Sequence, residues 1–260
     1  MRLPKKIVNI LTISLINSCN RKCSYCPIKK WLVPLKKWLS WDYCLNNKDL
    51  LKWIKKHINP EKWFIELTGG EPGLYPEIDD LIEELTKLGF YGIVKTNGII
   101  NIKRTKNFQL ITAWHYGVEN IPAYYDKIVI IKNPQDKWRQ KVRFCKENKI
   151  PYKTTLFDPI NEGARINEVF CNINKTINSI HVNSSGQITA CAAAKINKDI
   201  TIFNENSSVP MKNLVSTCLR CKNINDIEVW LPDDIRAKFV ADFDECYKEQ
   251  REMRNEKSGN

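Results

Sequence analysis

The sequence predicts an α/β fold: a partial (β/α)6, TIM-like barrel over residues 1–160, followed by a small cysteine-rich β-hairpin and helix extension over residues 161–260. Up to residue 160, short runs rich in Ile, Val and Thr alternate with apolar patterns of helical period. Such alternation is typical of parallel strands joined by right-handed crossover helices. After residue 161 the long helical patterns stop and scattered cysteines replace them. No low-complexity linker divides the chain, so we expect the second part to pack directly on the first.

Six strands are predicted in the first part because their residues are β-branched or aromatic and end at turn signals. In order they are Ile7–Ile16, Trp63–Thr68, Tyr91–Thr96, Leu110–His115, Asp126–Ile131 and Pro151–Phe157. Apolar residues at helical spacing predict the intervening helices Asn47–Ile58, Tyr75–Leu88 and Pro134–Asn148. In the second part, Ser179–Asn183 and Ser184–Thr189 predict a β-hairpin, and Asp233–Lys257 has the spacing of a terminal helix.

Composition narrows the class of protein. The 260 residues are 43% hydrophobic, enough for a packed core, and their apolar runs are too short to cross a membrane. No secretory signal pattern precedes the ten cysteines, so we expect a cytoplasmic, oxygen-sensitive protein with metal-bound thiols rather than disulfides. Residues 1–62 hold fourteen Lys/Arg against three acidic residues, and so carry most of the net charge of +12. The positive electrostatic field of this stretch favours an anionic partner, although an AT-rich genome would give the same lysine bias.

The most informative motif is Cys19, Cys23 and Cys26, spaced C-x3-C-x2-C. Three thiolates on one tight loop can hold three irons of a [4Fe–4S] cluster and leave the fourth iron open to a small molecule. A zinc site is the alternative, but it would usually add a histidine or a second cysteine pair, and the loop has neither.

A second motif follows the strand at Trp63–Thr68: Gly69, Gly70, Glu71 and Pro72. Glycines after a strand let backbone approach a ligand closely. Together the two motifs resemble those of the radical S-adenosylmethionine (SAM) family. The resemblance implies that SAM chelates the open iron, that the Gly-Gly-Glu-Pro segment positions its methionine end, and that Tyr25 lies near its adenine.

The other candidate residues also lie at strand ends. In parallel barrels the chemistry is at the carboxyl ends of the strands. Thr96 and Asn97 end the third predicted strand and His115 ends the fourth, so we expect all three near the cofactor. A neutral imidazole at His115 could bind SAM or take a proton, although a structural histidine is the equal alternative.

Four cysteines of the second part form a further pattern: Cys171, Cys191, Cys218 and Cys221. A C-x2-C pair with two single cysteines can close a four-thiolate site around an iron–sulfur cluster or a structural zinc. Their order around the predicted hairpin resembles the Twitch or SPASM auxiliary-cluster extension of radical SAM enzymes. The remaining cysteines, Cys44, Cys145 and Cys246, are interpreted as ordinary thiols.

The resemblance implies an oxidoreductase that cleaves SAM reductively to a 5′-deoxyadenosyl radical, which abstracts hydrogen from its substrate. Short Twitch dehydrogenases of the 2-deoxy-scyllo-inosamine dehydrogenase type combine the same two parts, which favours two-electron oxidation of a small molecule. A flavodoxin or ferredoxin would supply the electron. The alternatives are modification of a peptide, of a nucleotide or of a nucleic acid, and a metal-binding regulator without catalysis.

Overall fold

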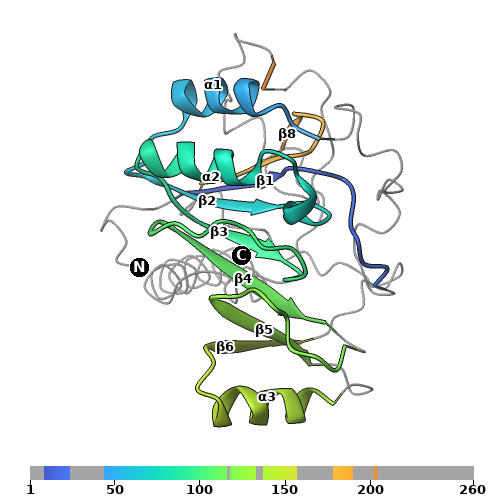
Figure 1. Cartoon of the computed structure of the whole chain (residues 1–260). Helices are drawn as coiled ribbons and strands as arrows, with labels where there is room; N and C mark the ends of the chain where they lie inside the picture. Colours follow the sequence, from blue (N-terminus) through green and yellow to red (C-terminus); the bar gives the residue numbers. More distant parts are fainter. Residues whose placement is uncertain are drawn as a thin grey trace, which may run out of the picture.

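The computed structural model describes residues 9–23, 44–115, 118–132, 137–156, 178–189 and 202–203. Within these ranges, eight strands form one sheet in the order β6-β5-β4-β3-β2-β1-β7-β8 (Figure 1). The strands are β1 Asn9–Ser14, β2 Trp63–Thr68, β3 Tyr91–Thr96, β4 Phe108–Trp114, β5 Lys127–Lys132, β6 Tyr152–Leu156, β7 Asn178–Val182 and β8 Ile188–Thr189. The helices are α1 Asn47–His57, the 3-10 turn η4 Pro72–Leu74, α2 Ile78–Lys87 and α3 Trp138–Glu147.

The predicted α/β architecture is confirmed. Strands β1 to β6 are parallel to their neighbours in chain order, as expected for the open barrel. Most predicted boundaries differ from the observed ones by one to a few residues, and two of these differences have a physical reason. β4 begins at Phe108, because that side chain is already buried in the core, and α2 begins at Ile78, because η4 occupies Pro72–Leu74 before it. The predicted terminal helix Asp233–Lys257 lies outside the described residues.

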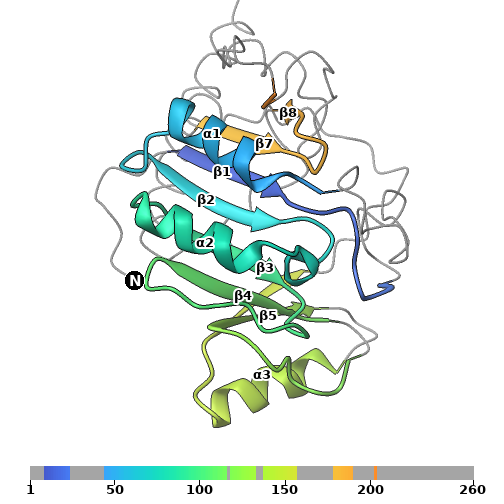
Figure 2. The ribbon, with the colours of Figure 1, turned by 45° about the horizontal axis from the view of Figure 1, so that its top comes forward.

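Helices α1 and α2 cover one face of the sheet (Figure 2). Their apolar residues, such as Leu50, Ile54 and Leu85, are fully buried against strand residues such as Leu11 and Ile65. Burying a side chain of this size contributes about 1.5–3 kcal/mol, so this layer fixes the inner strands. Helix α3 makes a second cluster over β4 and β5. No helix in the described part of the chain is long and apolar enough to span a membrane.

The predicted hairpin is present as the antiparallel pair β7 and β8. The sequence pattern did not reveal that β7 also pairs in parallel with β1, on the side opposite β2. The pairing joins Asn9 to Asn178 and Ile13 to Val182. A strand pattern states which residues extend but not which strand they pair with, so this long-range contact could not be deduced. A strand from the predicted extension is therefore a full member of the core sheet.

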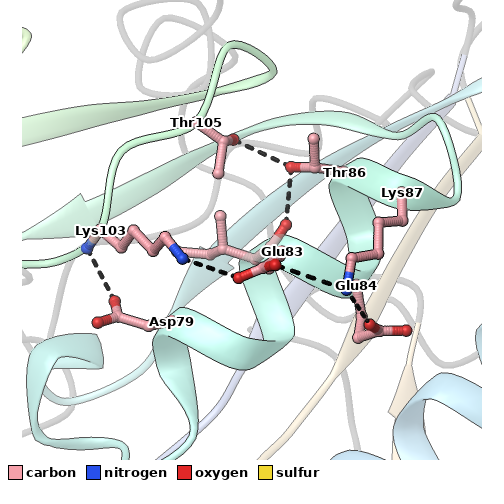
Figure 3. Close-up of polar contacts among 8 residues, drawn as sticks. Asp79, Glu83, Glu84, Thr86, Lys87, Lys103 and Thr105 are labelled. Atoms are coloured by element: carbon pink, nitrogen blue, oxygen red, sulfur yellow. Dashed lines mark hydrogen bonds and ion pairs between the residues drawn. The ribbon is translucent and has the colours of Figure 1, made fainter.

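A surface network attaches α2 to the connection between β3 and β4 (Figure 3). Lys103 donates from its backbone N–H to Asp79 at 2.8 Å and from its ammonium to Glu83 at 2.8 Å. Thr86 shares a 3.0 Å hydrogen bond with Thr105. The ion pairs of Glu83 are exposed, so their contribution to stability is small.

Candidate active site

The loops after β1 and β2 carry the two sequence motifs and are hydrogen-bonded to each other. Leu15 donates to the Thr68 carbonyl at 2.9 Å, and Gly70 donates to the Ile16 carbonyl at 2.7 Å. Glu71 then donates to the Ser18 carbonyl at 2.8 Å, one residue before Cys19. The ladder between β1 and β2 thus continues past the strand ends, and the Gly-Gly-Glu segment sets the path of the chain into the cysteine loop.

Gly70 is a glycine because the chain before the cysteines passes directly over it. A Cβ at this position would lie 2.5 Å from the Ser18 carbonyl carbon and 2.9 Å from the Ser18 nitrogen. The sequence suggested that this space is kept clear for SAM. The structure shows that the protein's own backbone fills it, so Gly70 is required to join the two motif loops.

Glu71 connects these loops to the end of β3. Its buried carboxylate accepts hydrogen bonds from the Thr96 hydroxyl at 2.6 Å, the Asn97 backbone N–H at 2.7 Å and the Gly73 N–H at 3.0 Å. Burial raises the pKa of this carboxyl, and the three hydrogen bonds oppose that rise. The Thr96 hydroxyl also accepts from the Gly98 N–H at 3.1 Å, so both of its described bonds are internal to the protein.

Asn97 brings the end of β3 to Cys19. Its side-chain nitrogen donates to the Asn20 side-chain oxygen at 2.7 Å and lies 3.9 Å from the Cys19 Sγ. Its side-chain oxygen accepts from the Ile99 N–H at 3.1 Å, which fixes the orientation of the amide. The Arg21 backbone N–H points at the same sulfur from 3.4 Å. Two N–H groups therefore converge on Cys19.

His115 brings the end of β4 to Cys23. Its Nδ1 lies 3.6 Å from the Cys23 Sγ. Burial lowers the pKa of His115 to about 4, and the nearby charges of Arg21 and Lys141 add to the effect, so the imidazole is neutral at pH 7. Lys141, a residue that the sequence analysis missed, is 5% exposed and donates to the His115 carbonyl at 2.9 Å. Its position four residues before the buried Cys145 on α3 was the available signal.

Polar side chains also lie on the sheet face turned away from α1 and α2. Glu66 and Lys95 form a 2.7 Å ion pair, and Ser14 lies 2.9 Å from the Nε2 of His181. These positions alternate with the apolar residues that pack under the helices. Glu66 and His181 are both register partners of Thr12, so they flank that residue on the two strands beside β1. Neither pair was a candidate from sequence.

The remaining predicted site residues lie outside the described residues. They are Tyr25, Cys26, Cys171, Cys191, Cys218 and Cys221. In the described part of the chain no group of three or more His, Cys, Asp or Glu side chains converges to hold a metal ion. Cys44 and Cys145 are buried free thiols, as predicted for ordinary cysteines, and burial raises the pKa of each.

Cys19 and Cys23 have the properties that thiolate ligands require. Both are partly exposed on one loop, whereas Cys44 and Cys145 are buried. N–H groups face the Cys19 sulfur, and a neutral imidazole faces the Cys23 sulfur. N–H donors stabilise the negative charge of a metal-bound thiolate. The surroundings of these two described cysteines fit the ligand role predicted for them in an iron–sulfur cluster.

Comparison with known proteins gives one curated relative and several solved structures. The GTP 3',8-cyclase of Aliarcobacter butzleri is 31% identical over 104 residues, which are 39% of this chain and 31% of that protein. The chain thus spans about a third of that relative. The Streptococcus suis SuiB structure with S-adenosylmethionine matches at a TM-score of 0.47 and 14% identity, over 85% of this chain and 68% of SuiB. SuiB bound to precursor peptide SuiA gives a TM-score of 0.49 at 14% identity, over 85% and 69%.

The family model of the radical SAM superfamily matches residues 13–166. This span covers more than half of the chain and contains the end of β1, all of β2 through β6, both motif loops and His115. Membership implies a [4Fe–4S] cluster and SAM as cofactors. The chain belongs to the radical SAM superfamily.

Proposed function

We propose that this chain is a radical SAM oxidoreductase that removes hydrogen from a small polar molecule. The observation that carries the proposal is the convergence of four strand ends on the cysteine loop. The loops after β1 and β2 are hydrogen-bonded to each other. At the end of β3, Asn97 contacts Cys19, and at the end of β4, His115 contacts Cys23. Such convergence at the carboxyl edge of a parallel sheet is where barrel enzymes build their active sites.

The residues have distinct proposed roles. Cys19, Cys23 and Cys26 would hold three irons of the cluster, and backbone groups of the Gly69–Gly70 turn would position the methionine end of SAM. When both are bound, the cluster would supply the electron that cleaves SAM, and the resulting radical would abstract a hydrogen atom. The Glu71 carboxylate serves the protein itself, because its three described hydrogen bonds hold the turn and the end of β3 together. Its contribution to SAM binding is therefore to fix the turn.

A polar substrate is supported by the sheet face that carries Glu66, Lys95, Ser14 and His181. Burying an ion pair and a histidine costs free energy that an apolar core would avoid. The presence of this ion pair and this histidine beside the motif loops is typical of a site that recognises a polar molecule by hydrogen bonds. The net oxidation rests on Cys171, Cys191, Cys218 and Cys221, whose order supports an auxiliary cluster that accepts the substrate's second electron.

Modification of a nucleotide is the second candidate. It is favoured by the aligned GTP 3',8-cyclase and by the excess of positive charge in residues 1–62, since nucleotides are anionic. Incubation with nucleoside triphosphates and with neutral cyclitols or sugars separates the two candidates by which of them gives a product.

The central test is iron loading and SAM cleavage after anaerobic reconstitution. The wild type should bind about eight irons, from two four-iron clusters, and release 5′-deoxyadenosine under dithionite. The variant with Cys19, Cys23 and Cys26 all changed to Ala should keep about four irons and lose cleavage. Cys145→Ala, which removes a buried thiol of α3, is the matched control and should retain both. Cleavage by the triple variant would refute the proposal.

A further inference from the structure

Three N–H-bearing groups contact the two described cysteines of the motif. The Arg21 backbone N–H lies 3.4 Å from the Cys19 Sγ, the Asn97 side-chain nitrogen lies 3.9 Å from the same atom, and the His115 Nδ1 lies 3.6 Å from the Cys23 Sγ. We propose that Asn97 and His115 are positioning residues that hydrogen-bond the thiolate ligands of the SAM-binding cluster and raise its reduction potential. This inference rests on the proposed function, which assigns Cys19 and Cys23 as ligands.

The Asn97 side chain is held in the orientation that this role needs. Its oxygen accepts the Ile99 N–H at 3.1 Å, and its backbone N–H is bound by Glu71 at 2.7 Å. The amide nitrogen consequently faces Asn20 and Cys19. With 4% of its surface exposed, Asn97 has little room to turn away. The Gly-Gly-Glu-Pro motif thus acts on the cysteine loop through Glu71 and Asn97.

His115 is anchored from a different element. The ammonium of Lys141 on α3 donates to its carbonyl at 2.9 Å and holds the end of β4 in place. The two nitrogens of an imidazole are distinct, and the partner of each decides which of them carries a proton. A metal-bound thiolate can only accept, so the nitrogen that faces Cys23 is the one that carries the proton. His115 therefore donates from Nδ1 when the cluster is bound.

The effect on the cluster follows from charge. One-electron reduction adds negative charge that is shared with the sulfur ligands, and N–H donors stabilise that charge. A donor aimed at a thiolate consequently favours the reduced form and raises the potential. The cluster of this enzyme must be reduced before SAM can be cleaved, so these two donors would make reduction by a weak donor protein easier.

The test is the midpoint potential of the SAM-binding cluster, measured by electron paramagnetic resonance during an anaerobic redox titration of the full-length enzyme. His115→Leu should lower the equilibrium constant for reduction about tenfold, which is about 59 mV for a one-electron couple. His115→Asn should restore most of the loss, because the Asn amide can place an N–H where Nδ1 lies. His57→Leu, on α1, is the matched control and should leave the potential unchanged.

Asn97→Leu provides an independent second measurement and should shift the potential in the same direction. A fully loaded His115→Leu enzyme with the wild-type potential would overturn the role of His115, and the same result for Asn97→Leu would overturn that of Asn97. Loss of the cluster from both variants would also overturn the inference, since it predicts a cluster that is tuned rather than assembled by these residues. A wild type that binds no four-iron cluster would instead refute the proposed function.

Discussion

Replacing Gly70 by alanine should destabilise the protein strongly, because the added methyl group meets backbone rather than a mobile side chain. The Cβ would lie 2.5 Å from the Ser18 carbonyl carbon, whereas carbon atoms pack at about 3.5–4.0 Å. The two segments must therefore separate by about 1 Å. That movement stretches the 2.7 Å bond from Gly70 to Ile16 and the 2.8 Å bond from Glu71 to Ser18 beyond useful length.

The magnitude follows from these contacts. Two lost backbone hydrogen bonds cost about 1 kcal/mol each, and forcing an extra methyl group into a packed site costs about 1–3 kcal/mol. The sum, about 4 kcal/mol, is a large part of the 5–15 kcal/mol by which domains are usually stable (about 10 on average). Urea unfolding followed by tryptophan fluorescence measures it directly.

Gly89→Ala is the matched control for this experiment. Gly89 has a φ of +86°, but its nearest neighbour to an added Cβ, on Pro60, is 4.0 Å away. Alanine there meets only the left-handed backbone penalty of about 1–2 kcal/mol. A loss in Gly70→Ala no larger than that in Gly89→Ala would show that the two motif loops are not packed as described.

Three further outcomes are expected. Cys218→Ala should still transfer deuterium from substrate into 5′-deoxyadenosine but give no oxidised product, whereas one zinc and only four irons in the wild type would contradict the auxiliary cluster. The free energy of unfolding should fall by about 2 kcal/mol from pH 7 to pH 5 because of His181: burial lowers its pKa to about 4, so over this range only the unfolded chain takes up a proton at this residue. In urea unfolding at several pH values, His181→Asn should lose this part of the pH dependence. Glu83→Gln should leave the urea midpoint unchanged, since its ion pairs are exposed, and a clear shift would show that the network of Figure 3 is stronger than surface pairs usually are.

The order of β1 to β6 and the position of the motifs could be predicted because both depend on local patterns. Alternating strands and helices specify parallel neighbours, and glycine or cysteine runs after strands specify the carboxyl edge of the sheet. The reason for Gly70 could not be predicted in the same way. Its close neighbour, Ser18, is 52 positions away in the chain, and only the fold reveals that the backbone of Ser18 fills the space beside it.

The contact between His115 and Cys23 shows the same limit. The sequence placed His115 near the cofactor because it ends a strand, but it did not indicate which atom of the site the ring meets. The sequence analysis missed three contacts because each joins residues from different elements. They are Lys141 with His115, Glu66 with Lys95, and Ser14 with His181. From sequence alone, a charged or polar residue inside a helix or strand is interpreted as facing solvent. Only the folded sheet shows which face it occupies.

The pairing of β7 with β1 has a consequence for the order in which the chain can mature during synthesis. β1 is made well before β7, so one of its edges stays open until residues 178–182 have been made. An unpaired strand edge invites association with other chains, and contacts across such sequence distances form late. The cysteine loop follows β1 directly, so its supporting strand gains its second neighbour only after β7 has been made. Insertion of iron and sulfur into a settled site is therefore expected only after residues 178–182 have been made, and a protein cut at residue 160 would leave that edge of β1 unpaired.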